Sequence, residues 1–276
     1  MHTKILAVVV AVAGVGVAAT AAQARIAAAT APSGYTIVPG VITNAPSSAL
    51  DSGADTLCPS GTVAWGGGVY FRGNEVPGET IGTTDDAGSA GWNTLVNNTS
   101  GSAQTFVVDA LCAKKPTGYK VVSASVTNPA GAQTAVSVTC PAKTVVLSAG
   151  IYSTSDSSSV GMTSLWPAST TKVTGKMFNG SGSSASEHVE AVCGAKPAGY
   201  TIAKFAIPLA AGSDLEGGAL CPSGTSVVGG GVNIASPGKN RPISANSDDG
   251  PTAWSVNLYN DTTTSVKVTT YAICAK

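Results

Sequence analysis

One short motif recurs at matched positions, and it constrains the fold more than any other feature of the chain. The letters C-P-S-G-T at residues 58–62 are followed by three consecutive glycines at residues 66–68, and residues 221–225 and 229–231 repeat both at the same spacing. A weaker copy begins at Cys140-Pro141 and ends at Ser148-Ala149-Gly150. The fold must therefore accommodate three copies of one unit.

The spacing around the motif defines the unit. Each copy opens with Gly-Tyr, and its first cysteine follows that tyrosine by 23, 21 and 21 residues. The second cysteine follows the first by 54, 53 and 53 residues, and an asparagine stands 14 residues before it, at Asn98, Asn179 and Asn260. This agreement indicates duplication. It predicts three units, which we call unit 1 (residues 34–117), unit 2 (118–198) and unit 3 (199–276).

The first 24 residues have the pattern of a bacterial signal peptide. Lys4 precedes an apolar run at residues 5–17, and Ala22-Gln23-Ala24 forms an A-x-A cleavage site. We therefore expect a mature chain from Arg25, with residues 25–33 as an N-terminal extension. The apolar run is short for a membrane span, so the sequence predicts a secreted, extracellular protein without one.

Six cysteines, two in each unit, predict three disulfides in an oxidising compartment. Six cysteines permit 15 pairings. Equivalent cysteines in duplicated units are expected to find equivalent partners, which selects Cys58 with Cys112, Cys140 with Cys193, and Cys221 with Cys274. A zinc site is disfavoured, because the chain has no C-x-x-C and only His188 remains after cleavage.

The low charge of the chain excludes one class of partner. Charged residues make up 11% of the sequence, and the formal net charge is zero. No basic stripe is available to neutralise phosphates, so nucleic acid is not an expected partner. The triple glycines precede strand-like runs rather than a helix, so they do not predict a phosphate-binding loop, and we expect no cofactor.

Alternating and β-branched runs predict an all-β fold with four or five strands in each unit. Two architectures remain open. The units form tandem small β sandwiches, or their sheets pack about a pseudo-threefold axis in a β-prism-like arrangement. Only residues 113–118 and 194–199 separate one unit's last cysteine from the next unit's tyrosine. These linkers are too short for flexible tethering, so they favour the threefold arrangement.

The motif C-P-x-G-x-x-x-x-G-G-G, followed by a tryptophan, an asparagine and a second cysteine, resembles a repeat of exported actinobacterial proteins, many without an assigned function. The resemblance covers units 1 and 3 closely and unit 2 loosely. In layout, three cysteine-bridged β units are more distantly similar to the threefold β-prism of vitelline-membrane outer-layer proteins. That likeness implies a prism fold and contact with glycans.

Aspartates near tryptophans are the strongest candidate binding residues. Asp85-Asp86 and Asp248-Asp249 lie in predicted loops a few residues before Trp92 and Trp254. A carboxylate beside an indole can hold a sugar, because the acid accepts hydroxyl protons while the ring covers the apolar face. We therefore predict two ligand sites, with turn-forming aspartates and packing tryptophans as the alternative. Their residues are Trp92 and Asp86 in unit 1, and Trp254 and Asp248 in unit 3.

Enzymatic activity is the least favoured hypothesis. His188, with Glu187 and Glu190 nearby, occurs in unit 2 alone and is interpreted as a solvated strand residue rather than part of a triad. No nucleophile elbow and no acid pair common to the units is found, so no catalytic residue is predicted. Trp65 and Trp166 have no counterparts in the other units and are interpreted as packing residues.

Together these features predict a secreted, non-enzymatic binding protein for glycans or cell-envelope polymers. The first alternative is a structural surface protein or an inhibitor-type protein that meets a protein partner through an apolar patch or a protruding loop. The second alternative is a secreted hydrolase whose acids converge in one cleft.

Overall fold

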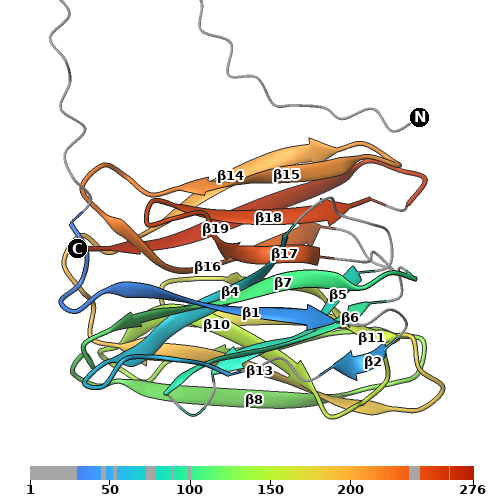
Figure 1. Ribbon diagram of the computed structural model, residues 1–276, viewed down its shortest axis with the longest axis horizontal. Coiled ribbons are helices and arrows are strands. Elements are labelled where there is room, and N and C mark those ends of the chain that lie inside the picture. The colour runs from blue at the N-terminus through green and yellow to red at the C-terminus, as the bar shows by residue number, and fades with distance from the viewer. Residues whose placement is uncertain are drawn as a thin grey trace, which may run out of the picture.

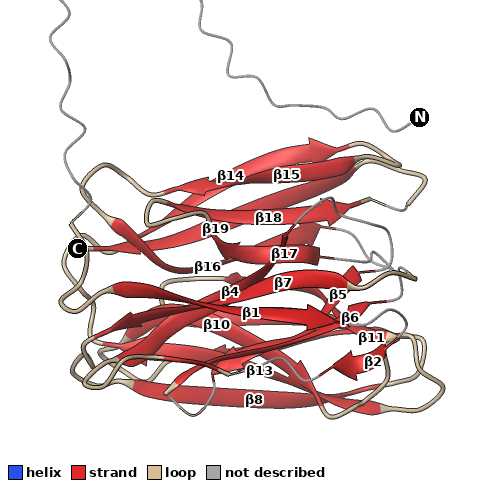
Figure 2. Cartoon of the chain, in the orientation of Figure 1, coloured by secondary structure: helices blue, strands red, loops and turns tan. Residues whose placement is uncertain are grey.

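The structure is a computed structural model that describes residues 30–44, 48–51, 55–72, 79–86, 88, 90–98, 101–235, 243–260 and 262–276 (Figure 1). All the secondary-structure elements within these ranges are β-strands, which confirms the all-β prediction (Figure 2). No helix in the described ranges is long and apolar enough to cross a membrane. The predicted signal peptide lies outside the described residues.

Each predicted unit contributes six strands in the same order, and unit 1 contains one further short strand, β3. Unit 1 contains β1 (Thr36–Asn44), β2 (Ser48–Asp51), β3 (Thr56–Leu57), β4 (Val63–Arg72), β5 (Glu79–Asp86), β6 (Gly91–Asn98) and β7 (Gln104–Ala113). Unit 2 contains β8 (Lys120–Asn128), β9 (Gln133–Thr139), β10 (Val145–Ser153), β11 (Val160–Pro167), β12 (Lys172–Asn179) and β13 (Ala185–Gly194). Unit 3 contains β14 (Thr201–Leu209), β15 (Asp214–Leu220), β16 (Ser226–Ala235), β17 (Ile243–Asp248), β18 (Ala253–Tyr259) and β19 (Val266–Ala275).

The prediction of four or five strands per unit was too low. The strands β5, β11 and β17 are among those that the sequence pattern did not predict. Each lies against the strand that carries the glycine motif of a neighbouring unit, which is β10, β16 and β4 respectively. The strand character of these segments therefore depends on pairing between units.

The strands form three sheets, and each sheet combines strands of two units (Figure 1). Sheet A has the order β1-β7-β4-β17-β18-β15, sheet B β2-β6-β5-β10-β13-β8 with β3 on β6, and sheet C β14-β19-β16-β11-β12-β9. Units 1 and 3 therefore share sheet A, units 1 and 2 share sheet B, and units 2 and 3 share sheet C. The units are not separate sandwiches, because each divides its strands between two sheets.

The two halves of each sheet meet at a junction that we call a seam. The seam of sheet A lies between β4 and β17, that of sheet B between β10 and β5, and that of sheet C between β16 and β11. A single register pair is assigned at each seam: Val69 with Asn246, Ile151 with Thr84, and Leu165 with Val232. Backbone pairing is therefore sparser at the seams than between other neighbouring strands, and side chains must contribute to the joint.

The three predicted disulfides are present. Cys58–Cys112, Cys140–Cys193 and Cys221–Cys274 have Cα–Cα distances of 5.6, 5.7 and 5.7 Å. In each bridge the first cysteine directly follows the second strand of its unit (β3 in unit 1) and the second lies in the last strand, which belongs to a different sheet. Each bridge therefore links two sheets at a corner of the molecule.

The first residues of the three glycine motifs meet in the core. A Cβ atom on Gly66 would lie 2.6 Å from both the Ser148 Oγ and the Val228 carbonyl oxygen, and one on Gly229 would lie 2.4 Å from the Leu147 carbonyl oxygen. The strands β4, β10 and β16 therefore converge, with room for one small side chain, that of Ser148. A single cluster of buried apolar residues from all three units surrounds this point, so the units share one core.

The asparagines at matched spacing hold turns. The Nδ2 groups of Asn98, Asn179 and Asn260 donate to carbonyl oxygens four residues ahead, over 2.8, 2.9 and 2.9 Å. All three side chains are buried. They satisfy the backbone of the turn that precedes the last strand of each unit.

Candidate ligand-binding surfaces

Trp92 and Trp254 are core residues, which corrects the prediction that they form exposed platforms at loop edges. Their exposed fractions are 0% and 1%. A Cβ on Gly67 would lie 2.2 Å from the Trp92 Cγ, and one on Gly230 would lie 2.2 Å from the Trp254 Cγ. The middle glycine of the motif is thus a slot for the indole ring.

The weaker motif of unit 2 fits this explanation. The position of Gly67 and Gly230 is taken there by Ala149, and the position of the two tryptophans is taken by Val173. Both residues are buried. Where the large ring is replaced by a small side chain, the slot is no longer needed and a methyl group fills the space.

The structure brings the predicted aspartates next to the tryptophans, but in strands rather than loops. Asp86 in β5 pairs with Trp92, and Asp248 in β17 pairs with Trp254. The Asp86 side chain is half-buried, whereas the Asp248 side chain lies outside the described residues. Since the indoles face the core, neither pair presents an acid beside an open ring face.

The third glycine of each motif lies at a seam. On the outer face of the sheet it is flanked by one residue from the strand on each side, and these three residues form a set. A Cβ on Gly150 would lie 3.0 Å from the Asp85 Cα, and one on Gly231 would lie 2.1 Å from the Leu165 carbonyl oxygen. We call the three-residue sets seam rows. They are Ser247–Gly68–Asp109 in sheet A (row A), Asp85–Gly150–Glu190 in sheet B (row B) and Trp166–Gly231–Tyr271 in sheet C (row C).

Row A is closed to ligands. The Ser247 hydroxyl donates to the Asp109 Oδ2 over 3.4 Å, and both side chains are buried. This row completes a joint between units 1 and 3 and offers no free surface.

Row B brings together two acids from different units. The Glu190 carboxylate accepts a hydrogen bond from the Asp86 backbone N–H, and the Asp85 carboxylate accepts one from the Asn93 side chain. Burial, then the Glu190 charge, raises the pKa of Asp85 to about 8. Burial, then the Asp86 charge, raises the pKa of Glu190 to about 7. Perturbed carboxyl groups of this kind are frequent at functional sites.

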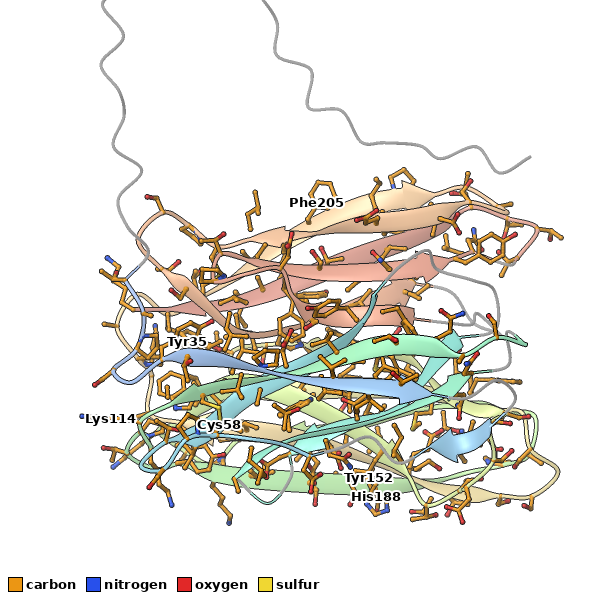
Figure 3. The ribbon with its side chains drawn as sticks, in the orientation of Figure 1. Tyr35, Cys58, Lys114, Tyr152, His188 and Phe205 are labelled. Carbon is orange, nitrogen blue, oxygen red and sulfur yellow. A yellow bond between two sulfur atoms is a disulfide. The ribbon has the colours of Figure 1, made fainter. Side chains whose placement is uncertain are left out.

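An aromatic pair stands beside row B. The rings of Tyr152 and His188 stack with centroids 4.5 Å apart and planes 4° from parallel. Figure 3 shows them close together at the outside of sheet B. The His188 Nε2 lies 3.1 Å from the Ser186 Oγ. The imidazole therefore packs on a phenol ring on the outside of the sheet, half-buried rather than fully solvated.

Row C carries aromatic rings and cations. Trp166 is half-buried, and the Lys176 Nζ lies 5.3 Å from its ring centroid. Tyr271 is 7% exposed, and the Lys204 Nζ lies 5.3 Å from its centroid. Burial lowers the pKa of Lys176. Of the four tryptophans, Trp166 alone is not fully buried, so the residue interpreted as packing is the one indole within reach of a ligand.

The described residues contain no group of three or more His, Cys, Asp or Glu side chains arranged to hold a metal ion. Comparison of the chain with models of known protein families gives no match, and a comparison with curated protein sequences gives none either.

Sequence reasoning missed that Asp85 and Glu190 lie on either side of Gly150, and that Trp166 and Tyr271 lie on either side of Gly231. A usable signal was present, because Asp109, Glu190 and Tyr271 each stand three residues before the second cysteine of a unit. Alignment of the units shows that this position differs in chemistry while its surroundings are alike. That contrast marks a position at which the units differ although the core pattern around it is shared.

Proposed function

We propose that the protein is an exported, non-enzymatic binding protein for cell-envelope glycans, and that it binds acidic polysaccharides through row C. The observation that supports this most is that the half-buried Trp166 indole and the Tyr271 ring flank Gly231, with one lysine ammonium group over each ring. Three disulfides are in keeping with an oxidising compartment.

The row continues across the sheet as a line suited to an extended polymer. Thr174 pairs with Trp166, and the Thr174 and Ser137 hydroxyls lie 2.8 Å apart on the next strands. On the other side Lys204 pairs with Tyr271. Six strands at about 4.8 Å spacing extend over roughly 24 Å. A charged sugar chain that lies along this line would therefore meet hydroxyl, aromatic and ammonium groups in turn.

The two lysines favour an acidic ligand. Each Nζ lies over an aromatic ring, and within the described ranges neither lysine forms an ion pair. Partial burial already disfavours the charged form of Lys176. A sugar carboxylate would favour the charged form of Lys176 through a charge-assisted hydrogen bond, which is stronger than a neutral one.

Calorimetric titration of the mature protein with polygalacturonate and with uncharged dextran tests the proposal. We expect binding of polygalacturonate alone, weakening with salt. Trp166→Ala should reduce the affinity about tenfold, as the loss of one aromatic platform implies, and the melting temperature should stay close to that of the wild type. Tyr259→Ala is the matched control, because this ring is 39% exposed on sheet A. Equal affinity of the wild type and Trp166→Ala would reject row C.

A hydrolase remains the second candidate, favoured by the two acids of row B. Release of new reducing ends from the same polysaccharides, lost in Glu190→Gln, would support it. Binding without any release supports the binding protein.

A further inference from the structure

We propose that Asp85 and Glu190 form a proton-dependent lock across the seam of sheet B, which holds β5 against β10 in acid and weakens in alkali. This inference concerns the joint between units 1 and 2 and does not depend on ligand binding at row C.

The geometry of the lock follows from Gly150. Because Gly150 has no side chain, Glu190 on β13 reaches over β10 and accepts a hydrogen bond from the Asp86 N–H on β5. Asp85 lies on the other side of the same glycine, whose Cβ would be 3.2 Å from the Asp85 Cβ. One register pair, Ile151 with Thr84, joins the two strands. The acids therefore add side-chain contacts to a joint that has a single register pair.

The groups that act on the pair are two further carboxyl groups, the Asn93 amide and one backbone N–H. Asp86 and Asp55 act on Asp85 by their negative charge, and Asn93 donates to it. Tyr152 lies close enough for Glu190 and Asp85 to raise its pKa, after burial, and His188 stacks on that ring. No lysine or arginine in the described residues compensates the pair. Repulsion and desolvation of a second negative charge at this seam therefore outweigh the two hydrogen bonds that favour it, one from Asn93 and one from the Asp86 N–H.

Two buried carboxyl oxygens favour a protonated state of the pair. Asp85 Oδ1 and Glu190 Oε2 are buried and have no hydrogen-bond partner among the described residues. A buried carboxylate oxygen without a partner is costly when charged, whereas a protonated carboxyl group tolerates it at lower cost. With one or both acids protonated, the joint loses its internal repulsion.

The direction of the pH effect follows from the raised pKa values. An acid whose folded pKa lies above its unfolded value stabilises the fold fully below the unfolded pKa, and this contribution is lost as the pH rises through the folded one. For Asp85 and Glu190 the loss extends from about pH 4 to the folded values of about 8 and 7.

The seams of sheets A and C provide internal comparisons. The seam of sheet A is joined by Ser247 and Asp109. At the seam of sheet C the Ile234 N–H donates to the Ser164 Oγ over 3.0 Å, and no acid is involved. Neither joint has a pair of acids raised in this way, so a local pH response is expected in sheet B alone.

Hydrogen exchange of the mature, disulfide-bonded protein tests the lock. Rates are measured at pH 5.5, 7.0 and 8.5 and divided by the intrinsic rates of the unfolded chain. We expect protection of β5 and β10 to fall about tenfold from pH 5.5 to 8.5 relative to the other two seams. The double variant Asp85→Asn/Glu190→Gln should abolish that local fall.

Glu187→Gln is the matched control, because Glu187 is buried on the same strand as Glu190 but pairs in register with Ser153, away from the seam. This variant should keep the local fall. If the double variant fails to fold, Glu190→Gln alone serves, and it should reduce the fall at β5 and β10. An equal loss of protection at all three seams, or a local loss that persists without the acids, overturns the proposal.

Discussion

The Tyr119 hydroxyl of unit 2 donates a 2.7 Å hydrogen bond to the Ala64 carbonyl oxygen of unit 1, at the point where β4 shifts register against β7. Tyr200 makes the same contact with Val146 over 2.8 Å, and Tyr35 with Val227 over 2.7 Å. Unit 2 thus reaches unit 1, unit 3 reaches unit 2, and unit 1 reaches unit 3. The opening tyrosines close the three units into a ring.

Removal of one of these hydroxyls should destabilise the whole molecule. Tyr119→Phe leaves the ring in place but removes the donor to a buried carbonyl group, a loss of roughly 1–3 kcal/mol. Chemical denaturation followed by fluorescence measures the effect. Tyr259→Phe, at an exposed position, is the control and should change stability little. A stability unchanged in Tyr119→Phe would show that the ring of hydroxyls is not energetically important.

The middle glycine of the motif and its tryptophan should be coupled in their effects on stability. Gly67→Ala places a methyl group 2.2 Å from the Trp92 Cγ, so it should destabilise the protein by more than the roughly 1–3 kcal/mol typical of overpacking. Trp92→Val alone leaves a cavity and costs about 3 kcal/mol or more. The double variant copies the Ala149 and Val173 of unit 2 and should be more stable than the sum of the single losses predicts. A double-mutant cycle with purely additive energies would contradict the slot.

The cysteine pairing was predictable from the sequence, because duplicated units repeat their partners. The burial of Trp92 was not. From the sequence alone Trp92 is expected at the edge of a loop. Its burial becomes clear only when β5 is known to be a strand and Gly67 of β4 is known to lie beneath the indole. Likewise, each of β5, β11 and β17 has one neighbouring strand that belongs to another unit. Local pattern carries little information about contacts that are created only when the units assemble.

The isolated unit 3, residues 199–276, should not fold. Its strands β15, β17 and β18 complete sheet A beside β4, while β14, β16 and β19 complete sheet C beside β11. Both half-sheets would lose their neighbours, and fewer than about 80 residues bury too little surface to compensate, even with one disulfide. A two-dimensional NMR spectrum of the fragment should show poor dispersion. A well-dispersed spectrum would mean that the unit has a core of its own.

Glu187 should make the global stability fall as the pH rises. Its side chain is 0% exposed and bonds to the Asn128 side chain, and burial raises its pKa to about 8. The folded pKa lies above the unfolded one, so the contribution of this acid is complete below about pH 4 and is lost as the pH rises through 8. The substitution Glu187→Gln keeps the shape of the side chain and an oxygen that can accept from the Asn128 amide, but it removes the charge. We expect the free energy of unfolding of the variant to match that of the wild type at pH 5 and to exceed it by roughly 1–3 kcal/mol at pH 9.

Urea denaturation at both pH values measures this difference, with Glu216→Gln, outside the buried core, as the control. A variant that is less stable than the wild type at pH 9 would mean that the ionised Glu187 is stabilised in the fold, contrary to its burial.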